Sequence, residues 1–193
     1  MTSAGCLDIF IGSMFSGKTT KLVDKYEECV NNSINVVALN YADDTRYHTT
    51  LLSTHDKRMI PCIQCKKLED IIHNEDVVNS EVILINEGQF FPDIFDMVIR
   101  MVENDHKHVV VCGLDSDFKR AKFGNWADLI MHCDSVTKLH ATCECGKPSI
   151  YSYRTSTEVQ QIVIGSSNYK PLCRKCYLRE MTQGASVQLA YSL

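Results

Sequence analysis

The feature that most constrains this chain is a glycine-rich segment close to its N-terminus. Residues 12–19 read Gly-Ser-Met-Phe-Ser-Gly-Lys-Thr, a complete match to the pattern G-x-x-x-x-G-K-[ST]. A short apolar run at 7–11 precedes the segment, and helical spacing follows it at Leu22, Tyr26 and Cys29. A strand, a glycine-rich turn and a helix in this order predict a phosphate-binding loop, because backbone N–H groups and a helix N-terminus face the anion.

Individual positions of this segment have separate chemical roles. Lys18 is expected to reach the outer phosphates of a nucleotide, and the Thr19 hydroxyl is expected to ligate Mg²⁺. The whole segment is the predicted phosphate loop: Gly12, Ser13, Met14, Phe15, Ser16, Gly17, Lys18 and Thr19. ATPases, GTPases and kinases all use such a loop, so it does not identify the phosphate acceptor.

Strand-like and helix-like segments alternate along the first two thirds of the chain. Strands are expected at 7–11, 34–39, 60–63, 81–86 and 108–114, and helices from residue 18 to about 31, at 67–74 and at 92–104. This alternation predicts an α/β fold with a mostly parallel sheet flanked by helices. The long polar stretch 40–56 is expected to be a functional loop.

The organisation of the chain changes near Ala141, which divides it into an expected α/β domain at 1–140 and a small C-terminal module at 141–193. Cys173-x-x-Cys176 has zinc-knuckle spacing, and Cys143-x-Cys145 stands upstream of it. Four thiolates would close a tetrahedral structural zinc site. The alternative is four buried free thiols, and His140 is a substitute ligand. Residues 177–193 are expected to form a mobile tail.

The remaining cysteines carry a weaker signal. Cys62-x-x-Cys65 has no second pair nearby in the sequence, so we interpret its spacing as incidental. The others lie in apolar segments and are expected in the core: Cys6, Cys29, Cys112 and Cys133.

Composition and charge exclude several function classes. The formal net charge of -4 draws the molecule neither to nucleic acid nor to an anionic membrane, so no stable nucleic-acid partner is expected. The longest apolar run, 109–114, is far shorter than a membrane span, and Asp8 interrupts the N-terminal apolar stretch too early for a signal peptide. We therefore expect a cytoplasmic protein with reduced cysteines and no membrane contact.

An acidic side chain follows the strand expected at 81–86. Glu87 falls at the carboxyl edge of the sheet, where ligands bind in open α/β folds. It could act as the general base that accepts a proton from an attacking hydroxyl, or it could be an exposed loop carboxylate. The spacing alone leaves both interpretations open.

Further motifs occur in a fixed order along the chain. They are the phosphate loop from Met14, Asp44-Thr45-Arg46-Tyr47, Thr54-His55-Asp56, Glu87-Gly88-Gln89-Phe90-Phe91, Leu114-Asp115-Ser116-Asp117-Phe118, Lys122-Phe123-Gly124, Lys138-Leu139, Arg154, Tyr169 and Cys173-Arg174-Lys175-Cys176. In order and spacing these motifs resemble the type II thymidine kinases, the cytosolic and poxvirus-like family. The resemblance runs from about residue 7 to residue 178.

The resemblance implies a RecA-like P-loop fold with a zinc-ribbon lasso module, and an enzyme that moves the γ-phosphate of ATP to the 5′-hydroxyl of thymidine. It implies catalytic roles for Glu87, Lys18 and Arg46. Beside the phosphate loop, the implied ATP-binding residues are Asp44, Thr45, Arg46, Asn86, Gly88 and Gln89. The implied thymidine-binding residues are Met14, Phe90, Leu114, Phe118, Phe123, Gln161, Ile162, Val163, Ile164, Gly165 and Tyr169. It also implies a homotetramer and feedback inhibition by dTTP, with deoxyuridine as a plausible second substrate.

Two positions depart from the pattern of the family. Asn86 stands where the family has an Asp that helps to hold Mg²⁺ through water, and the loss of one negative charge predicts weaker Mg²⁺ binding rather than lost activity. Asp115 could supply the missing acid. Cys143 and Cys145 are separated by one residue where the family has two.

Three other functions remain as alternatives. Another P-loop enzyme would hydrolyse ATP without thymidine or would phosphorylate thymidine monophosphate. A zinc-ribbon module for single-stranded nucleic acid would use the basic and aromatic residues of 169–179. A degenerate kinase would bind nucleotide but turn over poorly because of Asn86, although Lys18, Thr19, Arg46 and Glu87 are all present.

Overall fold

The fold is built on a six-stranded parallel sheet. The computed structural model describes residues 4–42, 51–163, 165 and 167–190. The strand order is β5-β2-β6-β7-β1-β8, and every pair of neighbours is parallel. The strands are β1 (Cys6–Gly12), β2 (Val36–Tyr41), β5 (Ile63–Cys65), β6 (Val82–Ile85), β7 (His108–Leu114) and β8 (Ser135–Leu139). The predicted α/β class is confirmed.

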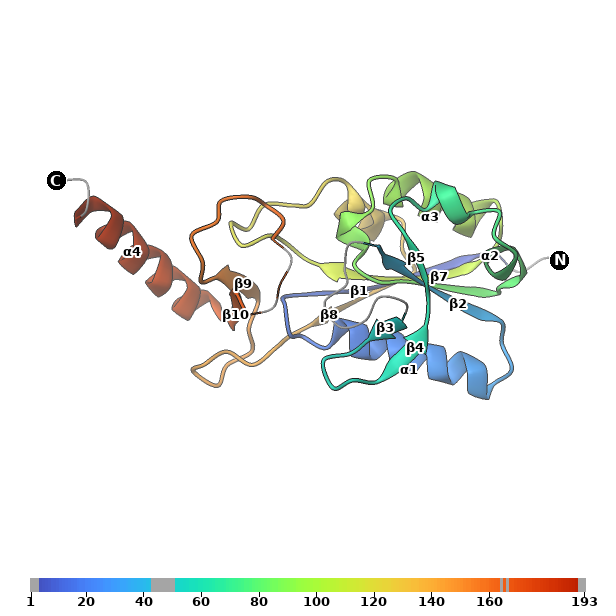
Figure 1. Cartoon of the computed structure of the whole chain (residues 1–193), viewed down its shortest axis with the longest axis horizontal. Coiled ribbons are helices and arrows are strands. Elements are labelled where there is room, and N and C mark those ends of the chain that lie inside the picture. Colours follow the sequence, from blue (N-terminus) through green and yellow to red (C-terminus); the bar gives the residue numbers. More distant parts are fainter. Residues whose placement is uncertain (1–3, 43–50, 164, 166, 191–193) are drawn as a thin grey trace.

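Helices cover both faces of the sheet (Figure 1). α1 (Lys18–Asn31) lies on one face, and α3 (Ile94–Glu103) lies on the other with the 3₁₀ helix η3 (Trp126–Met131). The shorter helices are η1 (Glu69–Ile71), α2 (Glu75–Asn79) and η2 (Gly88–Phe90). Within the described part of the chain, no helix combines the length and the apolar character needed to cross a bilayer.

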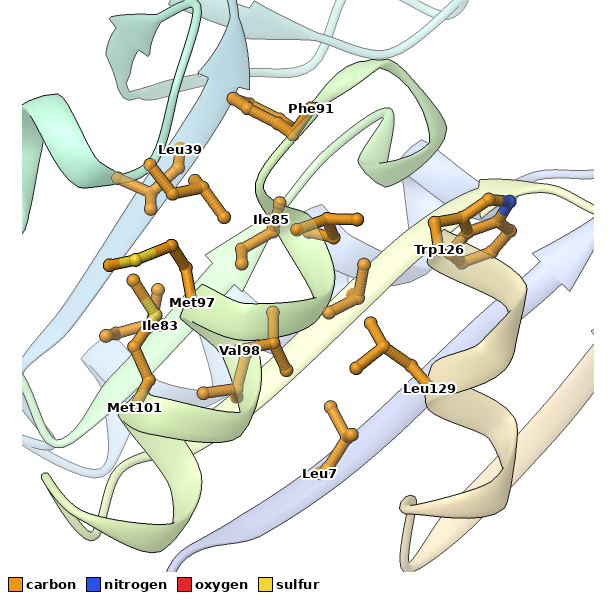
Figure 2. Close-up of a cluster of buried hydrophobic side chains, with 14 of the residues drawn as sticks. Leu7, Leu39, Ile83, Ile85, Phe91, Met97, Val98, Met101, Trp126 and Leu129 are labelled. Carbon is orange, nitrogen blue, oxygen red and sulfur yellow. The ribbon is translucent and has the colours of Figure 1, made fainter. Parts of the chain in front are cut away.

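The hydrophobic core has two layers, one on each face of the sheet. Alternate residues of β1, among them Leu7 and Ile9, point toward α3 and η3, and Figure 2 shows Val98 and Leu129 facing this layer. The opposite layer places Leu22 of α1 against Val110 of β7. Because both faces are covered, the central strand β6 is buried at all four positions, as its unbroken apolar sequence predicts.

A small module at the C-terminal end of the chain lies beside the carboxyl edge of the sheet. It contains the antiparallel strands β9 (Tyr151–Arg154) and β10 (Tyr169–Leu172) and the helix α4 (Arg174–Ala190), which extends away from the sheet (Figure 1). Most of the segment expected as a mobile tail from residue 177 is therefore helical, because α4 continues to Ala190. Tyr177, in the first turns of α4, is fully buried against Tyr151 and Tyr153.

Two predicted elements differ from the structure, and one strand was not predicted. The strand expected at 60–63 is divided between β4 (Met59–Pro61), which pairs with β3 (Leu51–Ser53), and β5, which joins the main sheet. The helix expected at 67–74 is a single 3₁₀ turn, and α2 starts only at residue 75, because the Asn74 side chain caps it by accepting from Asp76 N at 2.9 Å. β8 was not predicted because its side chains are exposed and lack an apolar pattern.

Candidate active site

A cavity of about 420 Å³ opens at the carboxyl ends of the central strands. This volume is in the usual range for a small-molecule site. Its lining combines the phosphate loop with apolar and polar side chains from six other segments. The predicted site residues that line it are Met14, Phe15, Ser16, Gly17, Lys18, Thr19, Glu87, Phe90, Leu114, Phe118, Phe123, Gln161, Ile162, Val163, Gly165 and Tyr169.

The phosphate loop has the backbone geometry that its glycines allow. Gly17 has a φ of 83° directly before α1, and Phe15 has a φ of 64°. Gly12 has no room for a side chain, because an added Cβ would lie 2.4 Å from the carbonyl oxygen of Leu139 in β8. Lys18 is buried and folds back over the loop, where its ammonium donates to the Ser13 carbonyl oxygen at 2.7 Å.

Asn86 lies behind Thr19 in a buried hydrogen-bonded chain. The Thr19 hydroxyl donates to Asn86 Oδ1 at 3.3 Å, and Asn86 Nδ2 donates to Asn40 Oδ1 at 2.8 Å. The Cys112 thiol also donates to Asn86 Oδ1, at 3.1 Å. The amide thus contacts the hydroxyl that is expected to ligate Mg²⁺. Asp115, considered above as a substitute acid, forms an ion pair with Lys138 at 3.0 Å, and its role toward Mg²⁺ stays a prediction.

Glu87 is held at the cavity wall by a dedicated set of contacts. Its φ of 54° is unfavourable for a residue with a side chain, and such strain is concentrated at functional sites. Gln89 Nε2 donates to Glu87 Oε2 at 2.5 Å, and Gln89 Oε1 accepts from Leu114 N at 3.0 Å. Gly88 packs against Val111 instead of lining the cavity. Gln89 therefore links Glu87 to the end of β7, and the ATP contacts expected of Gly88 and Gln89 stay predictions.

Aromatic side chains form one wall of the cavity. Phe90 and Phe123 meet edge to face with ring centroids 6.1 Å apart, and Tyr41 packs against Phe90 at 5.5 Å. Met14 and Phe123 are almost completely buried. Such a wall fits a flat, largely apolar ring.

A loop between β9 and β10 closes one side of the cavity, and Arg154 holds it. The buried guanidinium donates to the carbonyl oxygens of Glu158 and Gln161 at 3.0 Å, to the carbonyl oxygen of Gln160, and to the Tyr169 hydroxyl at 2.5 Å. It also stacks on Phe118, 3.7 Å from the ring centroid. Arg154 thereby joins the loop to the aromatic wall.

Further side chains to which the sequence analysis gave no binding or catalytic role also shape the site. Asp117 accepts from Lys119 N and Ala121 N at 2.8 Å and from Gln161 Nε2 at 2.9 Å. Ser152 accepts from Met14 N at 2.9 Å and so joins the small module to the phosphate loop. The added lining residues are Thr20, Tyr41, Ser53, His55, Asp56, Ser116, Asp117 and Ser152. Serine and backbone contacts of this kind have no sequence pattern that would have revealed them.

Other predicted site residues are not among the described residues that line the cavity. Asp44, Thr45, Arg46 and Ile164 lie outside the described residues. Ser13 is fully buried behind the lining, where its hydroxyl is 2.9 Å from that of Ser149. The roles proposed for all these residues stay predictions.

The four cysteines of the small module converge, as their spacing predicts. The sulfur atoms of Cys143, Cys145, Cys173 and Cys176 all lie within 4.8 Å of one another, and Cys145 Sγ is 3.6 Å from both Cys143 and Cys173. A tetrahedral zinc with Zn–S bonds of about 2.3 Å places its sulfurs about 3.8 Å apart, so this donor set fits zinc. His140, the substitute ligand considered above, is not part of this group, and its Nδ1 lies 3.0 Å from the Ser149 carbonyl oxygen.

The thiols of this cluster ionise unequally. The backbone N–H of Cys176 lowers the pKa of Cys173 to about 7, whereas burial and the neighbouring thiols raise the pKa of Cys176 to about 12. Four adjacent thiolates therefore require a cation, which is the electrostatic reason for such a cluster to bind a metal.

Comparison with known proteins identifies the family. The family model described as thymidine kinase matches residues 5–177. The chain belongs to the thymidine kinase family. The Variola virus thymidine kinase is 39% identical over 178 residues, covering 91% of this chain and 98% of the viral protein. The corresponding Vaccinia virus protein (strain Western Reserve) is 38% identical over the same length.

A plant relative extends the comparison. The rice (Oryza sativa subsp. japonica) thymidine kinase is 39% identical over 180 residues, which cover 90% of this chain but only 66% of the rice protein. The range matched by the family model, residues 5–177, includes the sheet, the loop held by Arg154 and the cysteine cluster. Family membership makes this chain an enzyme of the thymidine kinase class, so the cavity is its candidate active site.

Proposed function

We propose that this thymidine kinase transfers the γ-phosphate of ATP to the 5′-hydroxyl of thymidine and releases dTMP and ADP. The observation that carries the proposal is that one cavity is lined by the phosphate loop, by Glu87 and by an aromatic wall. A loop for phosphates and an apolar slot for a flat base, joined in one cavity, suit a nucleoside acceptor. Deoxyuridine lacks only the thymine methyl group, worth about 1 kcal/mol in an apolar pocket, so it is proposed as a weaker second substrate.

The reaction assigns a separate task to each group. The thymidine 5′-oxygen attacks the γ-phosphorus, the bond to the β,γ-bridging oxygen breaks, and Glu87 accepts the hydroxyl proton. Lys18 and Arg46 offset the charge on the transferring phosphoryl group. Thr19 and, through water, Asn86 would hold Mg²⁺, which supplies further positive charge at the phosphates.

The aromatic wall and the closing loop select the base. Phe90, Phe118 and Phe123 would enclose the ring, while main-chain groups of residues 161–165 pair with its polar edge. A base that leaves these buried groups unpaired is rejected, because unpaired buried polar groups are costly.

Assembly and control of the enzyme complete the proposal. A homotetramer in the cytoplasm, inhibition by dTTP at the thymidine site and a structural zinc in the cysteine cluster are proposed from the family resemblance. The division into a nucleotide-binding domain at 1–140 and a zinc-binding lasso module with its tail at 141–193 is part of the same proposal.

The proposal is tested with purified protein, ATP, Mg²⁺ and labelled thymidine. Wild type should form dTMP, and Glu87→Gln should lower kcat by about 10²–10⁴, the contribution of a general base, while ATP binding persists. Glu103→Gln, at the end of α3, is the matched control and should behave as wild type.

Other outcomes would support the alternatives. ATP hydrolysis that does not need thymidine, or phosphorylation of dTMP instead of thymidine, would replace the proposal with another P-loop activity. ATP binding without dTMP formation at any Mg²⁺ concentration would mean a degenerate kinase.

A further inference from the structure

A second group of metal-ligating side chains lies at the end of the sheet opposite to the cavity. The ligand atoms of Cys6, Asp8 and His108 all lie within 4.8 Å of one another. Strand register explains their convergence, because Cys6 in β1 is the partner of His108 in β7 and Asp8 lies two residues further along β1. Residues at this spacing share one face of a sheet, so the backbone itself directs the three side chains to one place.

Neighbouring groups fix the orientation of these ligands. His108 Nε2 and Asp8 Oδ2 are 2.7 Å apart, and the Ser135 hydroxyl of β8 donates to the other oxygen of Asp8. A metal ligand that is hydrogen-bonded through its second oxygen is typical of preorganised sites. The side chains of His108 and Asp8 are 29% and 25% exposed, so an ion can reach them from solvent.

The local charge favours a cation. Asp134, which accepts from Leu7 N at 2.8 Å, adds a second carboxylate beside Cys6. Lys25 is the cation that acts on Cys6, and it is itself paired with Glu28 at 3.2 Å. A divalent ion would offset the negative charge of these two carboxylates.

We propose that Cys6, Asp8 and His108 form a second metal site, for a borderline divalent transition ion such as Zn²⁺. One sulfur, one nitrogen and one oxygen ligand suit Zn²⁺ and disfavour Mg²⁺, which prefers oxygen ligands alone. Three protein ligands leave a fourth position for water or for a ligand from another molecule.

This site is separate from the chemistry of phosphate transfer. β1 carries Cys6 at one end and Gly12 of the phosphate loop at the other, a separation of about 20 Å at roughly 3.3 Å per residue. It is also separate from the cysteine cluster, whose residues begin at Cys143. Each chain would therefore bind two zinc ions.

The test is the metal content of the full-length protein after incubation with micromolar Zn²⁺ and removal of free ion, measured by elemental analysis. Wild type should retain two zinc ions per chain, and Cys6→Ser and His108→Gln should each retain one, with thymidine phosphorylation unchanged. Cys133→Ser and His132→Gln, just before the neighbouring strand β8, are matched controls that should keep two. Asp8→Asn, which should also retain one, is a third variant in case Cys6→Ser folds poorly.

Cobalt substitution gives a second readout. The thiolate-to-cobalt absorption should increase when the second equivalent of Co²⁺ binds, and Cys6→Ser should abolish this second increment alone. One zinc per wild-type chain would overturn the proposal, because the three side chains would then be a hydrogen-bonded cluster only. A second zinc retained by both Cys6→Ser and His108→Gln, or lost from Cys133→Ser, would also overturn it by assigning the ion to other residues.

Discussion

Arg154→Lys tests whether the buried guanidinium organises the thymidine side of the cavity. Arg154 contacts two segments of the module at once: the carbonyl oxygens of Glu158, Gln160 and Gln161 in the loop, and the hydroxyl of Tyr169 in β10. Lysine keeps the charge but presents a single ammonium in place of a planar fork, and it cannot stack on Phe118 in the same way.

The size of the effect follows from the hydrogen bonds that are lost. Arg154 donates five, two of them to Tyr169, and an ammonium can donate at most three. Each lost charge-assisted hydrogen bond contributes about 1.5–3 kcal/mol, and water replaces part of that contribution. The free energy that favours the ordered loop should therefore fall by about 2 kcal/mol. Because about 1.4 kcal/mol is a factor of ten, the thymidine-competent loop becomes about thirtyfold less populated and the apparent KM for thymidine rises by that factor.

Initial rates over a range of thymidine concentrations measure the change. The KM for ATP should stay constant, since none of the contacts of Arg154 given above reaches the phosphate loop. Arg174→Lys is the matched control, because Arg174 donates to the Tyr151 hydroxyl at 2.6 Å on the exposed side of the module. An unchanged thymidine KM in Arg154→Lys, or an equal rise in Arg174→Lys, would refute the reasoning.

Three further predictions concern the metal ions and the support of Glu87. Asn86→Asp adds a charge next to Thr19, so half-maximal activity should need several-fold less Mg²⁺; an unchanged Mg²⁺ titration would contradict this. Gly113→Ala places a Cβ 2.6 Å from Gln89 Oε1 and should lower kcat about a hundredfold by displacing the support of Glu87; a wild-type kcat would be the contrary result. A zinc chelator should lower the thermal midpoint and open residues 141–177 to protease; resistance to cleavage would argue against a structural zinc.

Local sequence signals predicted the elements that begin at the phosphate loop. The apolar run before Gly12 and the helical spacing after Lys18 correspond to β1 and α1, because burial on one side of each element imposes a period on the sequence. The strand at 108–114 has the predicted bounds, since a strand covered on both faces must be apolar throughout. Paired cysteine spacing likewise predicted a cluster whose halves are 28 residues apart.

Other parts of the fold and the site depend on contacts that produce no periodic pattern in the sequence. β8 was not predicted because its exposed side chains do not alternate with buried ones. Its backbone nevertheless completes the sheet, and the carbonyl of Leu139 leaves room only for glycine at position 12. Nothing in the sequence indicated that Gln89 supports Glu87, because this role depends on the approach of Gly113 and Leu114 in the neighbouring strand.

The sequence by itself determined the α/β class, the phosphate loop, the cysteine cluster and the family, because each depends on residue types at short, fixed spacings. Only the tertiary structure decided how Arg154 holds the loop, since its acceptors are largely carbonyl oxygens that any residue could supply. The same holds for Cys6 and His108, which are far apart in the chain and meet because two parallel strands pair in one register.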